Sequence, residues 1–75
     1  MSETRRVAMI TGALGFVGRH LVLELERQTS WEVVGVARQA ASLGARTRVL
    51  SCDLNDGELV RRVVAHHAPD IIIHL

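Results

Sequence analysis

Four short, mostly apolar runs recur along this chain, at residues 7–11, 32–37, 47–51 and 70–75. Each run is rich in valine, isoleucine or leucine, so each predicts a β-strand. The runs are close to continuous and do not alternate strictly between apolar and polar side chains. They therefore predict strands that are buried on both faces, as in a parallel sheet.

Two stretches between these runs have the periodicity of amphipathic helices. Within residues 16–28, Val17, Leu21 and Leu25 recur every four residues, and charged side chains, Arg19 among them, fall on the other face. The segment after the third run predicts a second helix that ends near residue 66, with an apolar stripe of Leu59, Val60, Val63 and Val64.

The remaining segments connect these elements. Residues 38–46 are small and polar, and we expect a loop with one helical turn around residues 40–43. Pro69 cannot continue the second helix and separates it from the last strand. With right-handed crossovers, the order of elements predicts an α/β fold, the N-terminal half of a Rossmann-like doubly wound parallel sheet with strand order 3-2-1-4.

Three glycines follow the first predicted strand at intervals of three residues, at Gly12, Gly15 and Gly18. We expect Gly12 to adopt the backbone angles of a tight turn and Gly18 to let the helix pack closely against the sheet. The absence of a side chain at Gly15 would let the backbone approach a pyrophosphate, which the free N–H groups of the first helical turn would face. The spacing alone also fits a turn that joins strand to helix and binds nothing.

Residues 11–18, TGALGFVG, resemble the TGxxGFxG signature of the extended short-chain dehydrogenases/reductases, which are mostly nucleotide-sugar epimerases, dehydratases and reductases. Two further segments resemble motifs of the same family, in the same order. Residues 52–56, CDLND, resemble its DLxD segment after the third strand, and residues 69–75, PDIIIHL, resemble the PDxVxHL stretch of its fourth strand. Three matches in order are far more specific than any one of them.

The resemblance implies a dinucleotide cofactor and, for the parent protein, a nucleotide-sugar substrate, with a homodimer as a possible assembly. It implies that the chain is the N-terminal part, residues 1–75, of a single NAD(P)-binding domain that is truncated after its fourth strand. The cofactor's pyrophosphate would be held by Gly12, Gly15, Phe16, Val17 and Gly18.

The residue after the second strand bears on which dinucleotide is bound. In NAD-preferring sites an Asp or Glu there accepts hydrogen bonds from the adenosine ribose, whereas this chain has Ala37 and Arg38. A guanidinium can clamp the 2′-phosphate of NADP with charge-assisted hydrogen bonds, so we expect NADP(H), with NAD as the alternative. Arg46 and Arg48 are expected to be solvated charges rather than parts of this site.

The resemblance also assigns the adenine end of the site. Asp53 would accept a hydrogen bond from the adenine amino group, and Leu54 would contact the same ring. The alternative is that Asp53 helps to cap the following helix. We expect Asn55 to fill that role, with Glu58 reaching back to it, because residues 55–58 have the pattern of a capping box.

The family's chemistry rests on a Tyr-x-x-x-Lys pair that lies well after the fourth strand. The Tyr acts as acid or base toward the substrate, and the Lys lowers the pKa of that Tyr. This chain contains neither Tyr nor Lys, so we assign it no catalytic residue and expect the enzyme to be the parent protein. The alternative is a non-catalytic relative that keeps the nucleotide-binding fold as a sensor or regulatory subunit.

The composition limits the classes of binding partner and the cellular compartment that we expect. The net charge of +1, with nine Arg and eight acidic residues spread along the chain, suggests no nucleic-acid partner, and no segment is apolar enough to suggest a membrane. The single Cys52 is expected to be a buried small side chain in a reducing, cytoplasmic setting. The adjacent His66 and His67 point to different helix faces, so no metal site is expected, and His74 is expected to be a hydrogen-bonded core residue.

Overall fold

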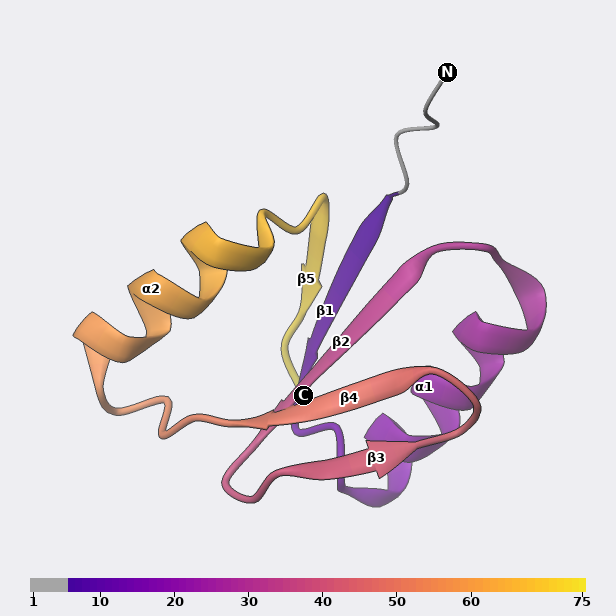
Figure 1. The fold of residues 1–75 in the computed structure, drawn as a ribbon. Coiled ribbons are helices and arrows are strands. Elements are labelled where there is room, and N and C mark those ends of the chain that lie inside the picture. Colours follow the sequence, from indigo (N-terminus) through magenta and orange to yellow (C-terminus); the bar gives the residue numbers. More distant parts are fainter. Residues whose placement is uncertain (1–5) are drawn as a thin grey trace.

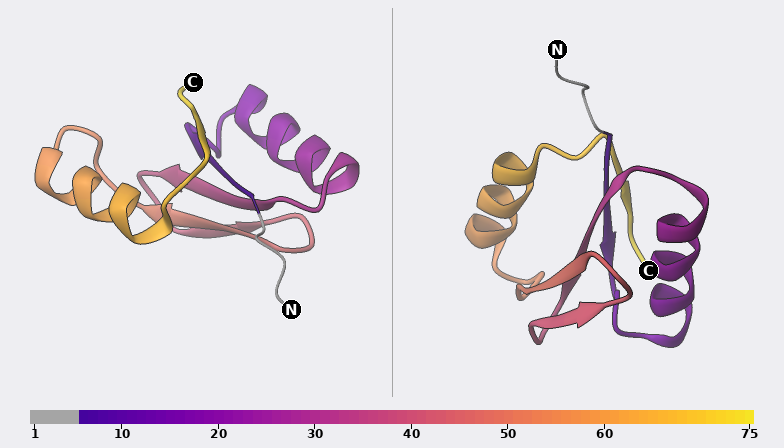
Figure 2. Two further views of the ribbon diagram at one scale, coloured as in Figure 1. Left: turned by 90° about the horizontal axis from the view of Figure 1, so that it is seen from above. Right: turned by 45° about the vertical axis from the view of Figure 1, so that its right-hand side comes forward.

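Five strands form one sheet, with a helix on each of its faces, in the computed structural model, which describes residues 6–75 (Figure 1). The two further views show α1 and α2 on opposite sides of the sheet (Figure 2). In chain order the elements are β1 (Val7–Thr11), α1 (Phe16–Gln28), β2 (Glu32–Ala37), β3 (Ala41–Leu43), β4 (Thr47–Ser51), α2 (Gly57–His67) and β5 (Ile71–Ile73).

The sheet has the order β3-β4-β2-β1-β5, and the four predicted strands are parallel in the predicted order. Strand β1 is paired on both sides, with Met9 opposite Val34 of β2 and opposite Ile72 of β5. The chain direction in β1, β2 and β4 brings the carboxyl ends of these strands together at one end of the sheet (Figure 1). The Rossmann-like α/β prediction is confirmed.

The helical turn predicted around residues 40–43 is wrong, because this segment forms the short strand β3. It pairs antiparallel with β4, with Ser42 opposite Arg48, and adds a fifth strand at the edge of the sheet. A turn that contains Gly44 at φ 61° reverses the chain between β3 and β4. The free backbone groups along β4 offer this segment a ladder of hydrogen bonds, which outweighs the weak helical preference of three residues.

The predicted cap of α2 is also wrong by one residue. Asp56 is the N-cap, and its side-chain Oδ1 accepts a hydrogen bond of 3.1 Å from the N–H of Leu59. Glu58 lies in the first turn and points to Arg61 and Arg62, at 3.7 and 3.9 Å, and therefore does not reach back to Asn55. Because the helix begins at residue 57, the residue three places after its cap is Leu59, so no reciprocal capping box can form.

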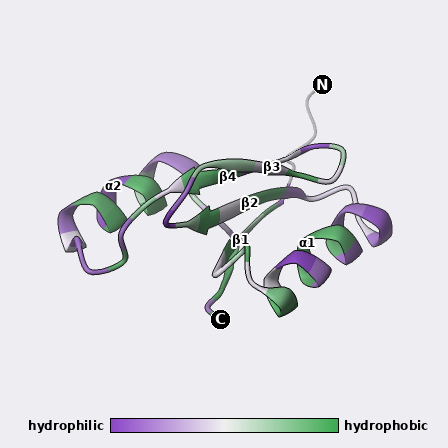
Figure 3. Ribbon diagram, turned by 90° about the horizontal axis from the view of Figure 1, so that it is seen from below, coloured by the Kyte–Doolittle hydropathy of each residue, from purple (hydrophilic) through white to green (hydrophobic). Residues whose placement is uncertain are grey.

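Each face of the sheet has its own apolar cluster, and the strands are largely hydrophobic (Figure 3). The cluster under α1 is formed by Ile10, Ala13, Val22, Val33 and Val49. The cluster under α2 is formed by Met9, Val34, Val36 and Cys52, with the predicted apolar stripe of α2 packed against it. The prediction that Cys52 is a buried small side chain is confirmed.

The strand β5 departs from the prediction that every strand is buried on both faces. Ile71 and Ile72 are 43% and 48% exposed. The reason is the position of β5 at the edge of the sheet, where β1 is its one neighbouring strand among the described residues. Burial on both faces holds for β2 and most of β1, which lie inside the sheet.

A carboxylate of α1 fastens the β3–β4 turn to the helix. The side chain of Glu26 accepts hydrogen bonds from the backbone N–H groups of Ala45 and Arg46, at 2.9 and 3.0 Å, and from the hydroxyl of Thr47. A Cβ on Gly44 would overlap this carboxylate, so the turn packs closely against it. Partial burial raises the pKa of Glu26, but the hydrogen bonds from Thr47 and the two backbone groups outweigh it and hold the pKa below its ordinary value of 4.5.

Arg46 completes this attachment from the other side. Its guanidinium donates to the carbonyl oxygens of Glu26, Thr29 and Trp31, at 3.2, 2.9 and 3.1 Å. A cation therefore binds the carbonyl groups at the C-terminal end of α1, where the helix dipole favours it. Arg46 has a structural role far from the carboxyl ends of the strands, and it is neither a purely solvated charge nor part of a nucleotide site.

We expect Glu26→Gln to destabilise the full-length protein by about 1–2 kcal/mol at pH 7, because the amide has only one acceptor oxygen for three donors. A carboxyl whose pKa is lowered by folding stabilises the folded state above its unfolded pKa, and this contribution is lost as the pH falls through the folded-state value. The difference from wild type should therefore shrink between about pH 5 and pH 3. Urea unfolding across this range measures it, with Glu32→Gln as control, because Glu32 is exposed at the start of β2. A difference that is constant with pH would contradict this role.

Candidate functional site

A groove of about 270 Å³ lies at the carboxyl ends of β1, β2 and β4, where the chain also leaves β5. It brings together segments that are far apart in the sequence and include most of the predicted site residues. Its lining is formed by Gly12, Leu14, Gly15, Ala37, Arg38, Cys52, Asp53, Leu54, Asn55 and Leu75.

The glycine turn forms the part of the groove next to α1. Gly12 has φ 69°, as predicted for a tight turn that leaves the strand, and its carbonyl oxygen accepts the N–H of Gly15 at 3.1 Å. A Cβ on Gly18 would overlap that same carbonyl oxygen and would lie 2.8 Å from the Cα of Ala13. Glycine is therefore required at position 18 by close contact with the turn, whereas the prediction had placed that contact with the sheet.

Gly15 is different, because the chain itself leaves room for a side chain there. A Cβ on Gly15 would meet only the Gly12 carbonyl oxygen, at an ordinary contact distance of 3.4 Å. Its backbone angles, φ −74° and ψ 172°, are open to any residue. The fold does not require glycine at this position, which is consistent with the prediction that the space belongs to a ligand.

The N-terminus of α1 lacks the cap that α2 has. Gly15 is its N-cap and has no side chain to accept a hydrogen bond, and no acidic residue lies in the first turn. By contrast, α2 has a carboxylate cap at Asp56 and an acidic side chain at Glu58. The backbone N–H groups at the start of α1, with the positive end of the helix dipole, are therefore left without an acceptor from a cap or an acidic side chain.

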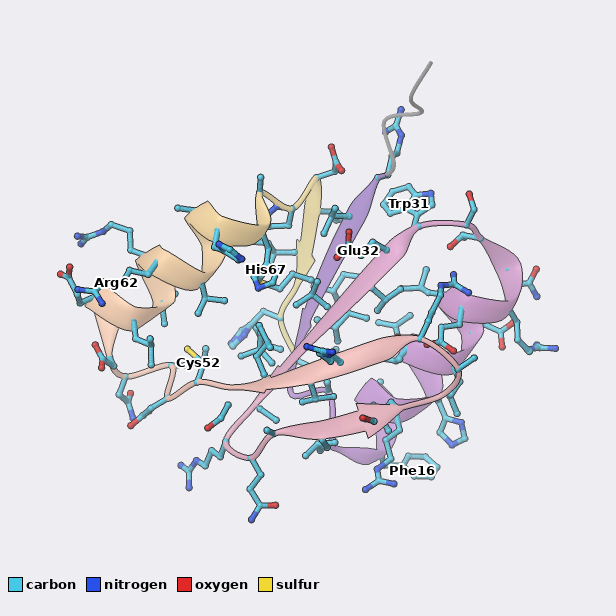
Figure 4. The ribbon with its side chains drawn as sticks, in the orientation of Figure 1. Phe16, Trp31, Glu32, Cys52, Arg62 and His67 are labelled. Atoms are coloured by element: carbon cyan, nitrogen blue, oxygen red, sulfur yellow. The ribbon has the colours of Figure 1, made fainter. Side chains whose placement is uncertain are left out.

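Phe16 and Val17, two of the residues predicted to hold the pyrophosphate, lie in the first turn of α1, next to the groove residue Gly15. Their side chains are 80% and 60% exposed, and neither lines the groove. Phe16 points away from the sheet at the start of α1 (Figure 4) and makes an edge contact with the ring of His20, with 4.6 Å between the centroids. The backbone N–H groups of these two residues, and not their side chains, therefore remain the candidates for the predicted role.

Arg38, Asp53 and Leu54, the residues predicted to bind the adenosine, also line the groove. The backbone of Arg38 is fixed by a hydrogen bond of 2.9 Å from the Ser51 hydroxyl to its carbonyl oxygen, while its side chain is exposed. One carboxylate oxygen of Asp53 accepts the N–H of Asn55 at 2.9 Å, so this side chain shapes the turn before α2. No hydrogen bond from residues 6–75 is made to its second oxygen.

Two residues at the junction of β1 and β5 were not assigned to the site by the sequence. The Thr11 hydroxyl oxygen lies 2.7 Å from Nδ1 of His74 and accepts the N–H of Leu75 at 3.2 Å. This hydroxyl ties the end of β5 to the glycine turn, so that Leu75 lies against Gly12. His74 is hydrogen-bonded as predicted, but it is exposed rather than part of the core.

The described residues offer little for other kinds of site. No group of three His, Cys, Asp or Glu side chains within residues 6–75 is placed to hold a metal ion. Cys52 lies between β4 and α2 (Figure 4) and is buried. In the same part of the chain, neither helix is long and apolar enough to cross a membrane.

The parallel strands are added to one side of β1 up to β4 and to its other side at β5. Together with the glycine turn and the uncapped helix that follow β1, this order is typical of a Rossmann-type fold. Proteins with this fold bind their ligands outside the carboxyl ends of the strands, at the point where the strand order changes side, and the groove lies there. Residues 8–75 match the NAD dependent epimerase/dehydratase family, and the chain belongs to that family. The predicted resemblance is confirmed.

Two curated relatives are similar over almost the whole chain. The dTDP-4-dehydro-6-deoxy-D-allose reductase of Streptomyces bikiniensis is 36% identical, over 92% of this chain and 24% of its own length. The methionine adenosyltransferase 2 subunit beta of Danio rerio is 34% identical, over 93% of this chain and 20% of its own length. The chain thus spans about a quarter or less of the length of these relatives.

Solved structures give the same result for the fold. An L-threonine dehydrogenase from Clostridium difficile superposes with a TM-score of 0.80 at 23% identity, over 97% of this chain and 24% of that protein. MoeE5 in complex with UDP-glucuronic acid and NAD superposes with a TM-score of 0.67 at 34% identity, over 91% of this chain and 21% of that protein.

Proposed function

We propose that this chain is the N-terminal part of a single dinucleotide-binding domain and holds the adenosine and pyrophosphate of a nicotinamide dinucleotide. The observation that carries the proposal is the start of α1, which lies beside the groove with free N–H groups and with neither a cap nor an acid. Such a helix end binds anions readily, and a pyrophosphate matches it in charge and size.

Different groups around the groove would bind different parts of the dinucleotide. The N–H groups of Phe16, Val17 and Gly18 would bind the pyrophosphate, and the open space beside Gly15 would admit it. Arg38 would bind a 2′-phosphate on the adenosine ribose, which favours NADP(H) over NAD(H). The free oxygen of Asp53 would accept the adenine amino group.

For the parent protein we propose an oxidoreductase that acts on a nucleotide sugar as an epimerase, dehydratase or reductase. The bound dinucleotide supplies the hydride acceptor or donor. Support comes from the relative named for a dTDP-linked sugar and from the similar structure that contains UDP-glucuronic acid with NAD. This chain contains no Tyr and no Lys, so its share of the reaction is to bind and orient the cofactor, while the proton transfer falls to other residues of the parent.

The experiment that tests this function is fluorescence titration of the full-length protein with NADPH and NADH. We expect Arg38→Ala to weaken NADPH binding by about 10- to 100-fold, since charge-assisted hydrogen bonds contribute about 1.5–3 kcal/mol, and to change NADH binding by less than about threefold. Arg48→Ala, an exposed arginine of β4 outside the groove, is the matched control. Equal losses for both nucleotides, or none for either, would contradict the role of Arg38.

A second function is favoured by one comparison, the match to a protein that is named as a subunit of methionine adenosyltransferase. The parent would then keep the nucleotide groove as a sensor or regulatory subunit. The two functions differ in whether the bound dinucleotide is oxidised or reduced. A regulatory subunit would bind the dinucleotide without oxidising or reducing it in the presence of nucleotide sugars, whereas an oxidoreductase would show a change in absorbance at the nicotinamide band or interconvert the sugars.

A further inference from the structure

Arg19 occupies a position in α1 that helix electrostatics disfavours. It lies near the N-terminal end of the helix, where the dipole is positive and a cation is unfavourable. Among residues 6–75 its guanidinium has no carboxylate within 4 Å. A helix that needed only stability would carry an acidic or neutral residue here, so the arginine calls for another explanation.

The guanidinium holds one peptide group of the glycine turn. Nε of Arg19 donates to the carbonyl oxygen of Leu14 at 3.0 Å. The N–H on the other side of the same peptide, that of Gly15, donates to the carbonyl oxygen of Gly12 at 3.1 Å. The Leu14–Gly15 peptide is therefore fixed at both of its polar ends.

We infer that Arg19 is a positioning residue of the pyrophosphate site, an inference that rests on the proposed function. By binding the Leu14 carbonyl oxygen, it keeps that oxygen out of the space in front of the N–H groups of Phe16 and Val17. If the peptide rotated, a partial negative charge would face the anion, and the Gly15 N–H would leave Gly12. The ligand's negative charge would also compensate the cation that the helix end disfavours.

Two substitutions separate the hydrogen bond from the bulk of the side chain. In Arg19→Gln the amide nitrogen occupies the place of Nε along the side chain and can donate to Leu14. In Arg19→Met a methyl group occupies that place and cannot. Arg27→Met is the matched control, since Arg27 is an exposed arginine of the same helix that binds Glu24 instead of the turn.

The experiment is titration of the full-length protein and these three variants with NADPH, below the lowest thermal unfolding midpoint of the set. We expect Arg19→Met to raise the dissociation constant about 10-fold, as for loss of one hydrogen bond that orders the site, and Arg19→Gln to remain within about threefold of wild type. Arg27→Met should bind as wild type does.

The inference is overturned if Arg19→Met binds as tightly as wild type, if Arg19→Gln is as weak as Arg19→Met, or if Arg27→Met is weakened equally. In each of these cases the wild-type protein still binds the dinucleotide, so the proposed function stands. If wild type binds neither NADPH nor NADH, the proposed function fails instead, and the inference fails with it.

Discussion

Gly15→Asp is expected to weaken dinucleotide binding at least about 100-fold while leaving the protein as stable as wild type or slightly more so. The new carboxylate would lie at the N-cap of α1 and accept the free N–H groups that we assign to the pyrophosphate. It would also repel the ligand, since two like charges about 4 Å apart near a protein surface interact by about 4 kcal/mol. As a cap it would stabilise the helix by a few tenths to about 1 kcal/mol.

Opposite effects on binding and stability distinguish this result from simple damage to the fold. Calorimetric titration with NADPH and thermal unfolding of the same full-length samples measure both. Gly57→Asp places the same carboxylate at the start of α2, away from the groove, and should leave binding unchanged. If Gly15→Asp binds NADPH as wild type does, the start of α1 is not the pyrophosphate site.

Gly18→Ala is expected to have the largest effect on stability, a loss of about 3 kcal/mol or more. The added Cβ would overlap the Gly12 carbonyl oxygen and crowd the Cα of Ala13, and both are backbone atoms that cannot turn aside as a flexible side chain would. Relief requires α1 to move away from the glycine turn, which would disturb the packing of Val22, a fully buried residue of this helix.

Denaturant unfolding of the full-length protein measures this loss, and Gly57→Ala provides the comparison. A Cβ on Gly57 would have no atom within 4 Å, and alanine favours the helix, so that variant should gain about 0.5–1 kcal/mol. Similar stabilities for the two alanine variants would show that α1 and the turn are not in the close contact described here.

The sequence was sufficient to predict the parallel core of the sheet because local pattern and long-range pairing agree there. The bounds of β1, β2 and β4 follow from short apolar runs, and those of α1 from its four-residue periodicity. The pattern of apolar and polar residues was insufficient where contact with another segment or a neighbouring residue determines the local structure. The three residues of β3 become a strand only because β4 offers an unpaired edge, and the cap of α2 moved by one residue because Asp56 competes with Asn55.

The candidate site shows the same division. Gly12, Gly15, Arg38, Asp53 and Leu54 could be placed at one groove because strand ends in a parallel sheet meet at one edge. The bond from Arg19 to Leu14 depends on the rotamer of a long side chain, which periodicity placed on the outer face. The contacts of Thr11 with His74 and Leu75 join residues 63 and 64 positions apart, which no local pattern reveals.

The exposure of Arg38 has a consequence for how this protein can diverge. Arg38 and Leu54 line the groove but belong to neither apolar cluster, whereas the end of the groove that we propose for the pyrophosphate is built from backbone groups whose geometry depends on Gly12 and Gly18. Under the proposed binding mode, substitutions of Arg38 that alter which adenosine nucleotide is accepted would leave folding almost unchanged. Substitutions of Gly12 or Gly18 would disturb the fold and the proposed site together.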